Sequence, residues 1–356
     1  MDGTSKQTPY QLPLVSVIIP VYRCRDTLQK AAESVLGQNY EKLELLLVPN
    51  GEDTDGSGQV CRHLAEKDRR VRVISCAEKG ASAARNEGIR QAKGGLIRFL
   101  DSDDTMVKGS LLPMVRTLQR DQSDLVIGGY RHLYFGSRVL KNVHQNAVVD
   151  PRRDREDMKR LYEEGFLNMP WNKLYVKEKI KSFFPQDLSL GEDLCFNQDY
   201  ISRVQRISLL QMPVCEYLQN ERQTTLSGGF RQDRIRVCLR LYGESHRFFS
   251  KLWELPKESG SALSFLDEKV VGTFLDDLGL LGVSASDREL REAVDNYVAA
   301  IRRFTERGRK KIRLKLPDHR ILYRAAVCNQ KSLLRQLLRI RGALVRMKRR
   351  HAANDT

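Results

Sequence analysis

The sequence predicts an α/β protein with a mostly parallel central sheet and flanking helices, extended by a mainly helical basic region. Four apolar, β-prone runs end near residues 19, 48, 75 and 100, and a stretch with helical spacing follows each of them. Such alternation produces a parallel sheet with right-handed crossovers. Beyond residue 229, helical periodicity dominates. We therefore expect a first domain at residues 1–228 and a second at residues 229–356.

The strands of the first domain are predicted from largely apolar, β-prone runs, and the continuous run at 14–19 is typical of a strand buried on both faces. Five such runs lie at 14–19, 43–48, 71–74, 97–100 and 125–128. The helices expected around them lie at about 26–36, 58–68, 82–92 and 109–120. Further along, the pattern predicts a hairpin, a helix and two more strands, at 130–150, 156–166, 207–210 and 213–217. Because parallel strands end at one edge of a sheet, the residues that follow them converge on one crevice.

Length and composition are those of a soluble globular protein. The 356 residues are 41% hydrophobic and 30% charged, which suffices for a sizeable core. No run approaches the ~18 apolar residues that span a bilayer, and the first residues lack the basic start and apolar stretch of a secretory signal. The seven cysteines are scattered without a Cys-x-x-Cys pair. This indicates neither a disulfide framework nor a zinc site, and predicts a reducing, cytoplasmic compartment.

The net charge of +16 points to phosphate-rich ligands, nucleic acid or an anionic membrane surface. Residues 320–350 contain ten Lys or Arg and no acidic residue. An apolar stripe runs through this basic stretch; it comprises Leu333, Leu334, Leu337, Leu338, Ile340, Leu344 and Val345. Two interpretations stay open: an amphipathic helix on an anionic membrane surface, or a helix packed on its own domain with a solvated basic face. No nucleic-acid-binding motif is present, so we expect no nucleic-acid partner.

The predicted strand at 97–100 is followed by three carboxylates within four residues, those of Asp101, Asp103 and Asp104. Hard divalent cations take oxygen ligands, and Mn2+ or Mg2+ is commonly held by one or two carboxylates plus substrate phosphates. The carboxyl ends of strands are also where open α/β sheets bind ligands. The stretch therefore predicts a metal site. The alternative is that Asp103 or Asp104 caps the helix that starts near Lys108.

Several segments together resemble the family 2 glycosyltransferases with the GT-A fold. They read VSVIIPVY at 15–22, SVLGQ at 34–38, GASAARNEGI at 80–89 and FLDSDD at 99–104. WNKLY at 171–175 and GED at 191–193 resemble the bacterial surface-polysaccharide branch, and the match covers roughly 12–227. The resemblance implies transfer of a sugar, usually with inversion, from a nucleotide-sugar donor to a hydroxyl of a glycan or lipid-linked acceptor. The basic stretch at 320–350 would keep such an enzyme peripheral at the inner face of the cell membrane, and the oligomeric state stays open.

The resemblance also implies roles for individual residues. Asp103, assisted by Asp101 or Asp104, would hold the metal that acts as Lewis acid on the leaving nucleoside diphosphate. Asp193 would be the general base that takes the proton of the acceptor hydroxyl. The alternative for Asp193 is an acidic residue in a first helical turn, where it favours the helix dipole.

Donor and acceptor contacts are implied in the same way. The donor-binding residues would be Pro20, Tyr22, Asn50, Asp55, Arg85, Asp101 and Ser102. The acceptor-binding residues would be Trp171, Asn172, Lys173 and Glu192. Asn220 and Arg222 fall in the segment that resembles the flexible loop closing over the donor phosphates. Two alternatives remain open: Arg85 as a surface arginine on a helix, and Trp171 as a core residue.

One segment departs from the family pattern. The second strand usually ends in Val-Asp-Asp-Gly-Ser-x-Asp, and here it reads VPNGEDTDGS at 48–57. The base-reading aspartate of the family maps onto Asn50. An aspartate only accepts from uracil N3, whereas an asparagine amide both donates and accepts. The identity of the base therefore stays open, and a catalytically weakened nucleotide-sugar-binding relative is the main alternative function. A basic nucleic-acid-binding protein is a further one.

Overall fold

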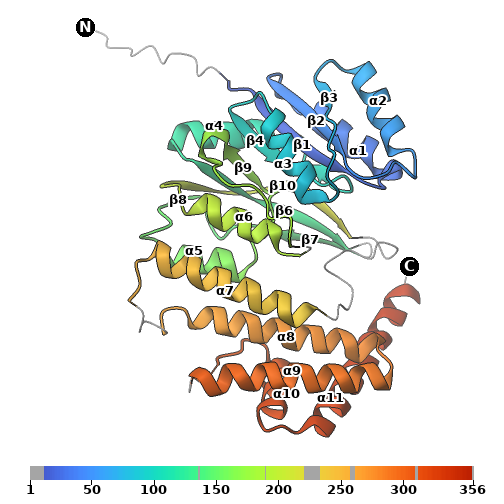
Figure 1. Ribbon diagram of the computed structural model, residues 1–356, viewed down its shortest axis with the longest axis vertical. Helices are drawn as coiled ribbons and strands as arrows, with labels where there is room; N and C mark the ends of the chain where they lie inside the picture. Colours follow the sequence, from blue (N-terminus) through green and yellow to red (C-terminus); the bar gives the residue numbers. More distant parts are fainter. Residues whose placement is uncertain are drawn as a thin grey trace. The chain divides into compact units, whose positions relative to one another are not determined.

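The computed structural model describes residues 12–134, 137–188, 190–219, 233–256, 261–308 and 312–354. The chain divides into two compact units, Met1–Gln223 and Thr224–Thr356, and each is described by itself (Figure 1). Within the described ranges, no helix combines the length and the hydropathy needed to cross a membrane.

The first half of unit 1 has the predicted alternation of strands and helices. The strands are β1 (Val15–Val21), β2 (Leu43–Pro49), β3 (Val71–Val73) and β4 (Leu96–Phe99). They pair in parallel in the order β3-β2-β1-β4. The helices between them are α1 (Arg25–Leu36), α2 (Ser57–Lys67) and α3 (Ala81–Gln91). All seven residues of β1 are buried, as expected for a strand covered on both faces.

The second half of unit 1 makes the sheet mixed rather than uniformly parallel. Its long strands β6 (Leu125–Tyr134) and β10 (Ile207–Gln219) pair in parallel. The short strand β9 (Lys173–Val176) runs antiparallel between β4 and β6. The sequence analysis did not assign this strand, because four residues are too few to show a period. Three more antiparallel strands lie at the margins: β5 (Thr105–Met106), β7 (Ser137–Lys141) and β8 (Ala147–Val149).

The region predicted as two strands at 207–210 and 213–217 is one strand, β10. The register against β6 shifts between Leu210 and Pro213 and again between Pro213 and Cys215. A proline has no N–H for the ladder, so a strand that contains one is accommodated by a bulge. The remaining helical elements of unit 1 are α4 (Leu111–Asp121), α5 (Arg155–Glu163), η1 (Lys177–Lys179) and α6 (Glu192–Ile201).

The carboxyl ends of β1, β2 and β4 lie together, as the parallel order predicts. The Asn50 N–H donates to the Val21 carbonyl at 3.1 Å, and the Leu100 N–H donates to the Ile18 carbonyl at 3.1 Å. The loops after β2 and β4 are thereby fixed on either side of the end of β1. Beneath them is an apolar core that includes Val17, Leu45 and Leu96.

Unit 2 is helical in its described parts. Its helices are α7 (Arg234–Leu252), α8 (Ser264–Ser284), α9 (Asp287–Gly308), α10 (Pro317–Val327) and α11 (Lys331–Asn354). Their shared core includes Phe274, Leu278 and Val294. Helices α8 and α11 touch along their backbones, because a Cβ placed on Gly342 would lie 2.1 Å from the Gly282 carbonyl oxygen. The basic stretch at 320–350 lies on two helices, because α10 ends at Val327 and α11 begins at Lys331.

Candidate active site

The three carboxylates after β4 lie in a turn that leads into β5. The Asp104 N–H donates to the Asp101 carbonyl at 3.1 Å. The Asp104 side chain is fully buried, and its Oδ1 accepts the Leu218 N–H at 3.0 Å. The alternative that these aspartates cap a helix near Lys108 is wrong. Strand β5 intervenes, and α4 begins only at Leu111, with no side-chain hydrogen bond at its cap.

The turn concentrates negative charge. Burial, reinforced by the charge of Asp101, raises the pKa of Asp103 to about 6. The same two causes raise the pKa of Asp104 well above its ordinary range. Oδ2 of Asp104 is buried without a hydrogen-bond partner among the described residues. Carboxylates that are desolvated next to one another are stabilised by a nearby cation, so this turn suits a cation.

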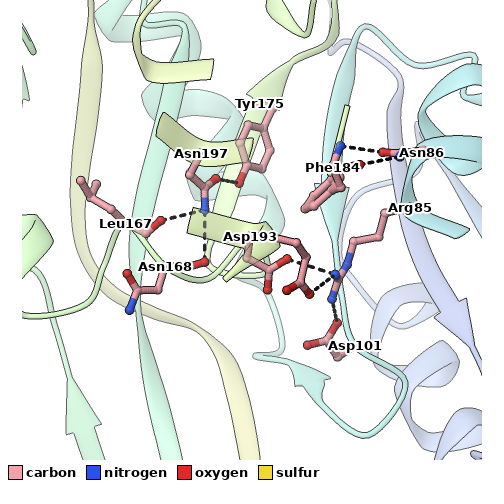
Figure 2. Close-up of polar contacts among 10 residues, drawn as sticks. Arg85, Asn86, Asp101, Leu167, Asn168, Tyr175, Phe184, Asp193 and Asn197 are labelled. Atoms are coloured by element: carbon pink, nitrogen blue, oxygen red, sulfur yellow. Dashed lines mark hydrogen bonds and ion pairs between the residues drawn. The ribbon is translucent and has the colours of Figure 1, made fainter. Parts of the chain in front are cut away.

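Arg85 supplies part of that positive charge from α3. Its Nη2 lies 2.8 Å from Oδ1 of Asp101, and its Nη1 lies 3.0 Å from Oδ1 of Asp193 (Figure 2). The same Nη1 lies 3.6 Å from Oε1 of Glu192. Only 4% of Arg85 is exposed. Burial alone would lower the pKa of Arg85, but Asp193, Asp101 and Glu192 together raise it above its ordinary value. The interpretation of Arg85 as a surface arginine is therefore wrong, and its guanidinium joins the β4 turn to α6.

Asp193 is the second residue of α6, as the first-turn interpretation predicts. Gly191 precedes the helix at φ 84°, a conformation that costs a glycine little. Burial raises the pKa of Asp193 to about 7, while Arg85 acts in the opposite direction. The side chain keeps 26% of its surface exposed. A carboxylate of this kind can accept a proton near neutral pH.

Phe184 packs against the arginine. The Asn86 amide donates to the Phe184 carbonyl at 2.9 Å and accepts the Phe184 N–H at 2.8 Å (Figure 2). The Phe184 ring stacks on Phe196 with centroids 3.9 Å apart, and the Arg85 guanidinium carbon lies 5.3 Å from its centroid. The sequence analysis quoted Asn86 within a motif but gave it no role. The signal available in the sequence was an asparagine directly after Arg85, a residue predicted to bind the donor.

Asn197 anchors the helix that carries Asp193. It lies one turn further along α6, and its amide donates to the Leu167 carbonyl at 2.8 Å. Its Oδ1 accepts the Tyr175 hydroxyl at 2.6 Å (Figure 2). The second turn of α6, which follows Asp193, is thereby tied to β9 and to the turn before that strand. The sequence analysis also missed this residue, whose signal was an asparagine among the apolar positions of a helix.

The residues predicted to contact the acceptor are mostly buried. Trp171 stacks on Tyr217 and is 4% exposed, so its interpretation as a core residue is confirmed. Lys173 and Asn172 are fully buried. The Lys173 ammonium donates to the Phe166 carbonyl at 2.6 Å, to Oδ1 of Asn172 at 2.9 Å and to the Met169 carbonyl. Acceptor contact stays a prediction for these residues and for Glu192, and the bonds of Lys173 make it a support of the 166–172 turn.

Burial of Lys173 also bears on the charge of the site. Desolvation lowers the pKa of Lys173 to about 7, while the charge of Asp193 acts to raise it. A lysine in this state is close to losing its proton at neutral pH. Its electrostatic coupling to Asp193 means that the protonation of one group affects the other.

Asn50 has a structural use at the end of β2. Its Nδ2 donates to the Val21 carbonyl at 3.2 Å, and its Oδ1 accepts the Gly80 N–H at 3.0 Å. The side chain, 5% exposed, therefore clamps the end of β1 to the start of α3. An aspartate cannot donate to the Val21 carbonyl, so asparagine is the residue that suits this clamp.

The other residues predicted to bind the donor lie around the same edge. Tyr22 is 51% exposed, whereas Pro20 is buried within β1. Asp55 accepts the Arg25 N–H at 3.0 Å and the Ser57 hydroxyl at 2.6 Å, and these bonds lower its pKa. Ser102 is partly buried in the turn after β4. Their contacts with a donor stay predictions. Asn220 and Arg222 lie outside the described residues.

Comparison with known proteins shows which enzyme family this chain is similar to. Residues 16–184 match the family model Glycosyl transferase family 2. The uncharacterized glycosyltransferase EpsJ of Bacillus subtilis is 30% identical over 219 residues, which are 60% of this chain and 63% of EpsJ. Glycosyltransferase GlyA of Streptococcus pneumoniae is 28% identical over 214 residues, 57% of this chain and 30% of GlyA. The match to glycosyl transferase family 2 therefore covers residues 16–184, just under half of the chain. The chain covers less than two thirds of the length of either relative.

The fold is shared with a solved structure. Staphylococcus aureus TarS 1–349 in complex with UDP-GlcNAc superposes with a TM-score of 0.65 at 19% identity, over 94% of this chain and 92% of that one. Identity this low shows the fold alone. The overlap reaches beyond unit 1 into unit 2, so the expected mixed α/β fold with a helical C-terminal region is confirmed.

Proposed function

We propose that this chain is a metal-dependent, inverting glycosyltransferase. It moves a sugar from a nucleotide-sugar donor, a UDP-sugar, to a hydroxyl of a glycan or lipid-linked acceptor in bacterial cell-surface polysaccharide synthesis. The observation that carries the proposal is the Arg85 ion-pair network. It links Asp101, in the turn after β4, with Asp193 at the start of α6. Candidate donor-binding and proton-accepting groups are thus held in one rigid arrangement.

Asp193 is the proposed general base. Its carboxylate takes the proton of the acceptor hydroxyl as the oxygen attacks the anomeric carbon. The bond from that carbon to the phosphate oxygen breaks, and the nucleoside diphosphate leaves with the electron pair. A base with a pKa near 7 accepts a proton efficiently at neutral pH. Arg85 holds the carboxylate in place and limits the rise of its pKa.

The carboxylates after β4 are the proposed metal ligands. The unpartnered Oδ2 of Asp104 and the raised pKa of Asp103 fit a site that gains a cation. Within the described residues, no group of three or more His, Cys, Asp or Glu side chains forms a ready metal site. One or two of these aspartates, together with donor phosphates, would complete the ligand set for Mn2+ or Mg2+. The bound ion would neutralise charge on the leaving diphosphate.

A thermal-shift screen tests the donor site. Purified protein is heated with UDP-, GDP-, dTDP- and CMP-sugars, each with and without Mn2+ or Mg2+. A ligand of the folded state raises the melting temperature by mass action, by an amount equivalent to about 2.7 kcal/mol at a hundred times its Kd. We expect a metal-dependent shift with UDP-sugars.

The matched variants are Asp103→Asn and Glu156→Gln. Asp103→Asn should abolish the metal-dependent part of the shift. Glu156 is a surface carboxylate whose side chain is 90% exposed, so its variant should behave as the parent. The proposal is contradicted if no donor shifts the melting temperature with either metal, and the metal role is contradicted if Asp103→Asn retains the full shift.

A second candidate is a nucleotide-sugar-binding relative with weakened catalysis. The bonds of Asn50 to Val21 and Gly80 favour it. Asn50 aligns with the base-reading position of the family, and its side chain is already occupied by these main-chain contacts. The two candidates predict different turnover. Donor binding without sugar transfer to any acceptor, in a preparation that also fails to hydrolyse the donor, would select the second.

A further inference from the structure

Helix α11 carries two apolar faces. Leu334 and Leu338 are fully buried in the core of unit 2. A second stripe of large apolar residues consists of Leu333, Leu337, Ile340, Leu344 and Met347. We refer to these five residues as the outer stripe. Of the apolar residues seen as one stripe in the sequence, Leu334 and Leu338 are therefore core residues and Leu337 packs at the edge of the core. Leu333, Ile340 and Leu344 are exposed.

Four of the five residues of the outer stripe are exposed, and the fifth, Leu337, packs against the edge of the unit 2 core. Leu333 is 44% exposed, Ile340 59%, Leu344 55% and Met347 58%, and Leu337 is partly buried. The spacing alternates between four and three residues, which keeps all five on one side of a helix. At 1.5 Å per residue, the stripe is about 21 Å long. A contiguous exposed patch of this kind marks an interaction surface.

The charge on α11 itself is of one sign. Helix α11 contains eight Lys or Arg and no Asp or Glu. Unit 2 as a whole has 28 Lys and Arg against 15 Asp and Glu, a net charge of +13. Arg339 and Arg341 pair with Asp287 and Asp318 of the same unit and still keep about a third of their side chains exposed. A partner surface that binds α11 is therefore expected to be anionic.

We infer that the outer stripe of α11 docks this protein on an anionic lipid bilayer, with the helix lying in the plane of the membrane interface. An apolar stripe inserts its side chains among the acyl chains near the headgroups, and basic side chains beside it bind anionic headgroups. A second copy of α11 is a poor occupant, because the positions beside the stripe offer arginine and no acidic partner, so two such helices would repel one another. The inference stands apart from the proposed transfer reaction, since it involves no donor-binding residue.

Vesicle flotation tests the inference. The full chain is mixed with vesicles of phosphatidylcholine alone or with 30% phosphatidylglycerol, and the bound fraction is measured at low and high salt. We expect binding to the anionic vesicles that weakens as salt screens the charges. The double variant Ile340→Gln/Leu344→Gln removes the centre of the outer stripe and should lower the partition coefficient on the order of tenfold to a hundredfold.

The control is Leu316→Gln/Ile321→Gln. These two residues are also exposed, at 50% and 56%, but lie outside α11. The control should bind vesicles as the parent does, and circular dichroism should show both variants folded. Equal loss in the two variants, equal binding to neutral vesicles, or no binding overturns the inference. The inference is also overturned if the protein forms a dimer without lipid and the stripe variant abolishes that dimer. It is overturned as well if a low concentration of RNA displaces the protein from vesicles. The donor-induced thermal shift is read on the same variants, which separates failure of docking from failure of the proposed reaction.

Discussion

The two units of this protein use charge in opposite ways. Unit 1 has 33 Lys and Arg against 30 Asp and Glu, and unit 2 has 28 against 15. In unit 1 the informative charges are buried and matched, as Arg85 is with Asp101 and Asp193. In unit 2 the excess is basic, and eight of its Lys and Arg lie on α11, which has no Asp or Glu. A buried charge constrains geometry at a site, whereas unbalanced surface charge creates a field that attracts a partner. The net charge of the chain therefore indicates what kind of partner unit 2 attracts, but it does not indicate the chemistry of the site in unit 1.

The largest effect is expected for Asp193→Asn, which tests whether the buried charge of unit 1 takes part in the reaction. The variant keeps the size of the side chain and removes the group that accepts the proton. We expect transfer to fall about 10³-fold, in the range that general-base removal produces. The donor-induced thermal shift should stay, because Asp193 is proposed to act on the acceptor. Initial rates with a glycan acceptor measure the effect, and a variant that retains full turnover would assign the base elsewhere.

Arg85→Gln tests whether the buried charge constrains the site. Removal of one partner from a buried ion-pair network leaves carboxylates without compensation, and we expect the free energy of unfolding to fall by about 3 kcal/mol. Without the guanidinium, the pKa of Asp193 should rise further above its value of about 7. A base acts when deprotonated, so the rising limb of the pH–rate profile should move to higher pH by about one unit. An unshifted profile would show that Arg85 does not control this carboxylate.

The sign of the stability change with pH follows from the same group. The pKa of Asp193 is higher in the folded protein than its ordinary value of 3.8. Between about pH 4 and pH 7 the folded state therefore binds more protons at this residue than the unfolded state does. The contribution of Asp193 to stability is largest at the acid end of this window and declines as the pH rises through it.

Much of unit 1 could be predicted from sequence, because its first four strands are largely apolar, β-prone runs that alternate with stretches of helical spacing. The turn after β4 and the first-turn position of Asp193 followed from local pattern. The partners of Arg85 did not, since Asp193 lies 108 residues further along the chain. The Asn86–Phe184 and Tyr175–Asn197 contacts were missed for the same reason. In α11, a helical period identified the apolar residues, but only burial separates the core face from the outer stripe.

Asn50→Asp tests whether the Asn50 amide is required at the edge of the site in unit 1. The carboxylate still accepts the Gly80 N–H, but it faces the Val21 carbonyl without a donor. We expect a loss of about 1–2 kcal/mol in the free energy of unfolding, the cost of leaving a buried polar group unpaired. The thermal shift with UDP, relative to other nucleoside diphosphates, should increase. If the variant is as stable as the parent, the amide does not serve as a clamp.

The smallest effect is expected where charge is paired at a surface. The Lys331 ammonium lies 2.9 Å from the Asp295 carboxylate, with 38% and 53% of the two side chains exposed. In high-dielectric surroundings such a pair contributes little, so Lys331→Gln should change the free energy of unfolding of unit 2 by about 0.5 kcal/mol or less. Denaturant unfolding of Lys331→Gln beside Arg85→Gln compares an exposed pair with a buried one. A loss of similar size in both would mean that ion pairs in unit 2 are as constraining as those at the site, and the contrast between the units would fail.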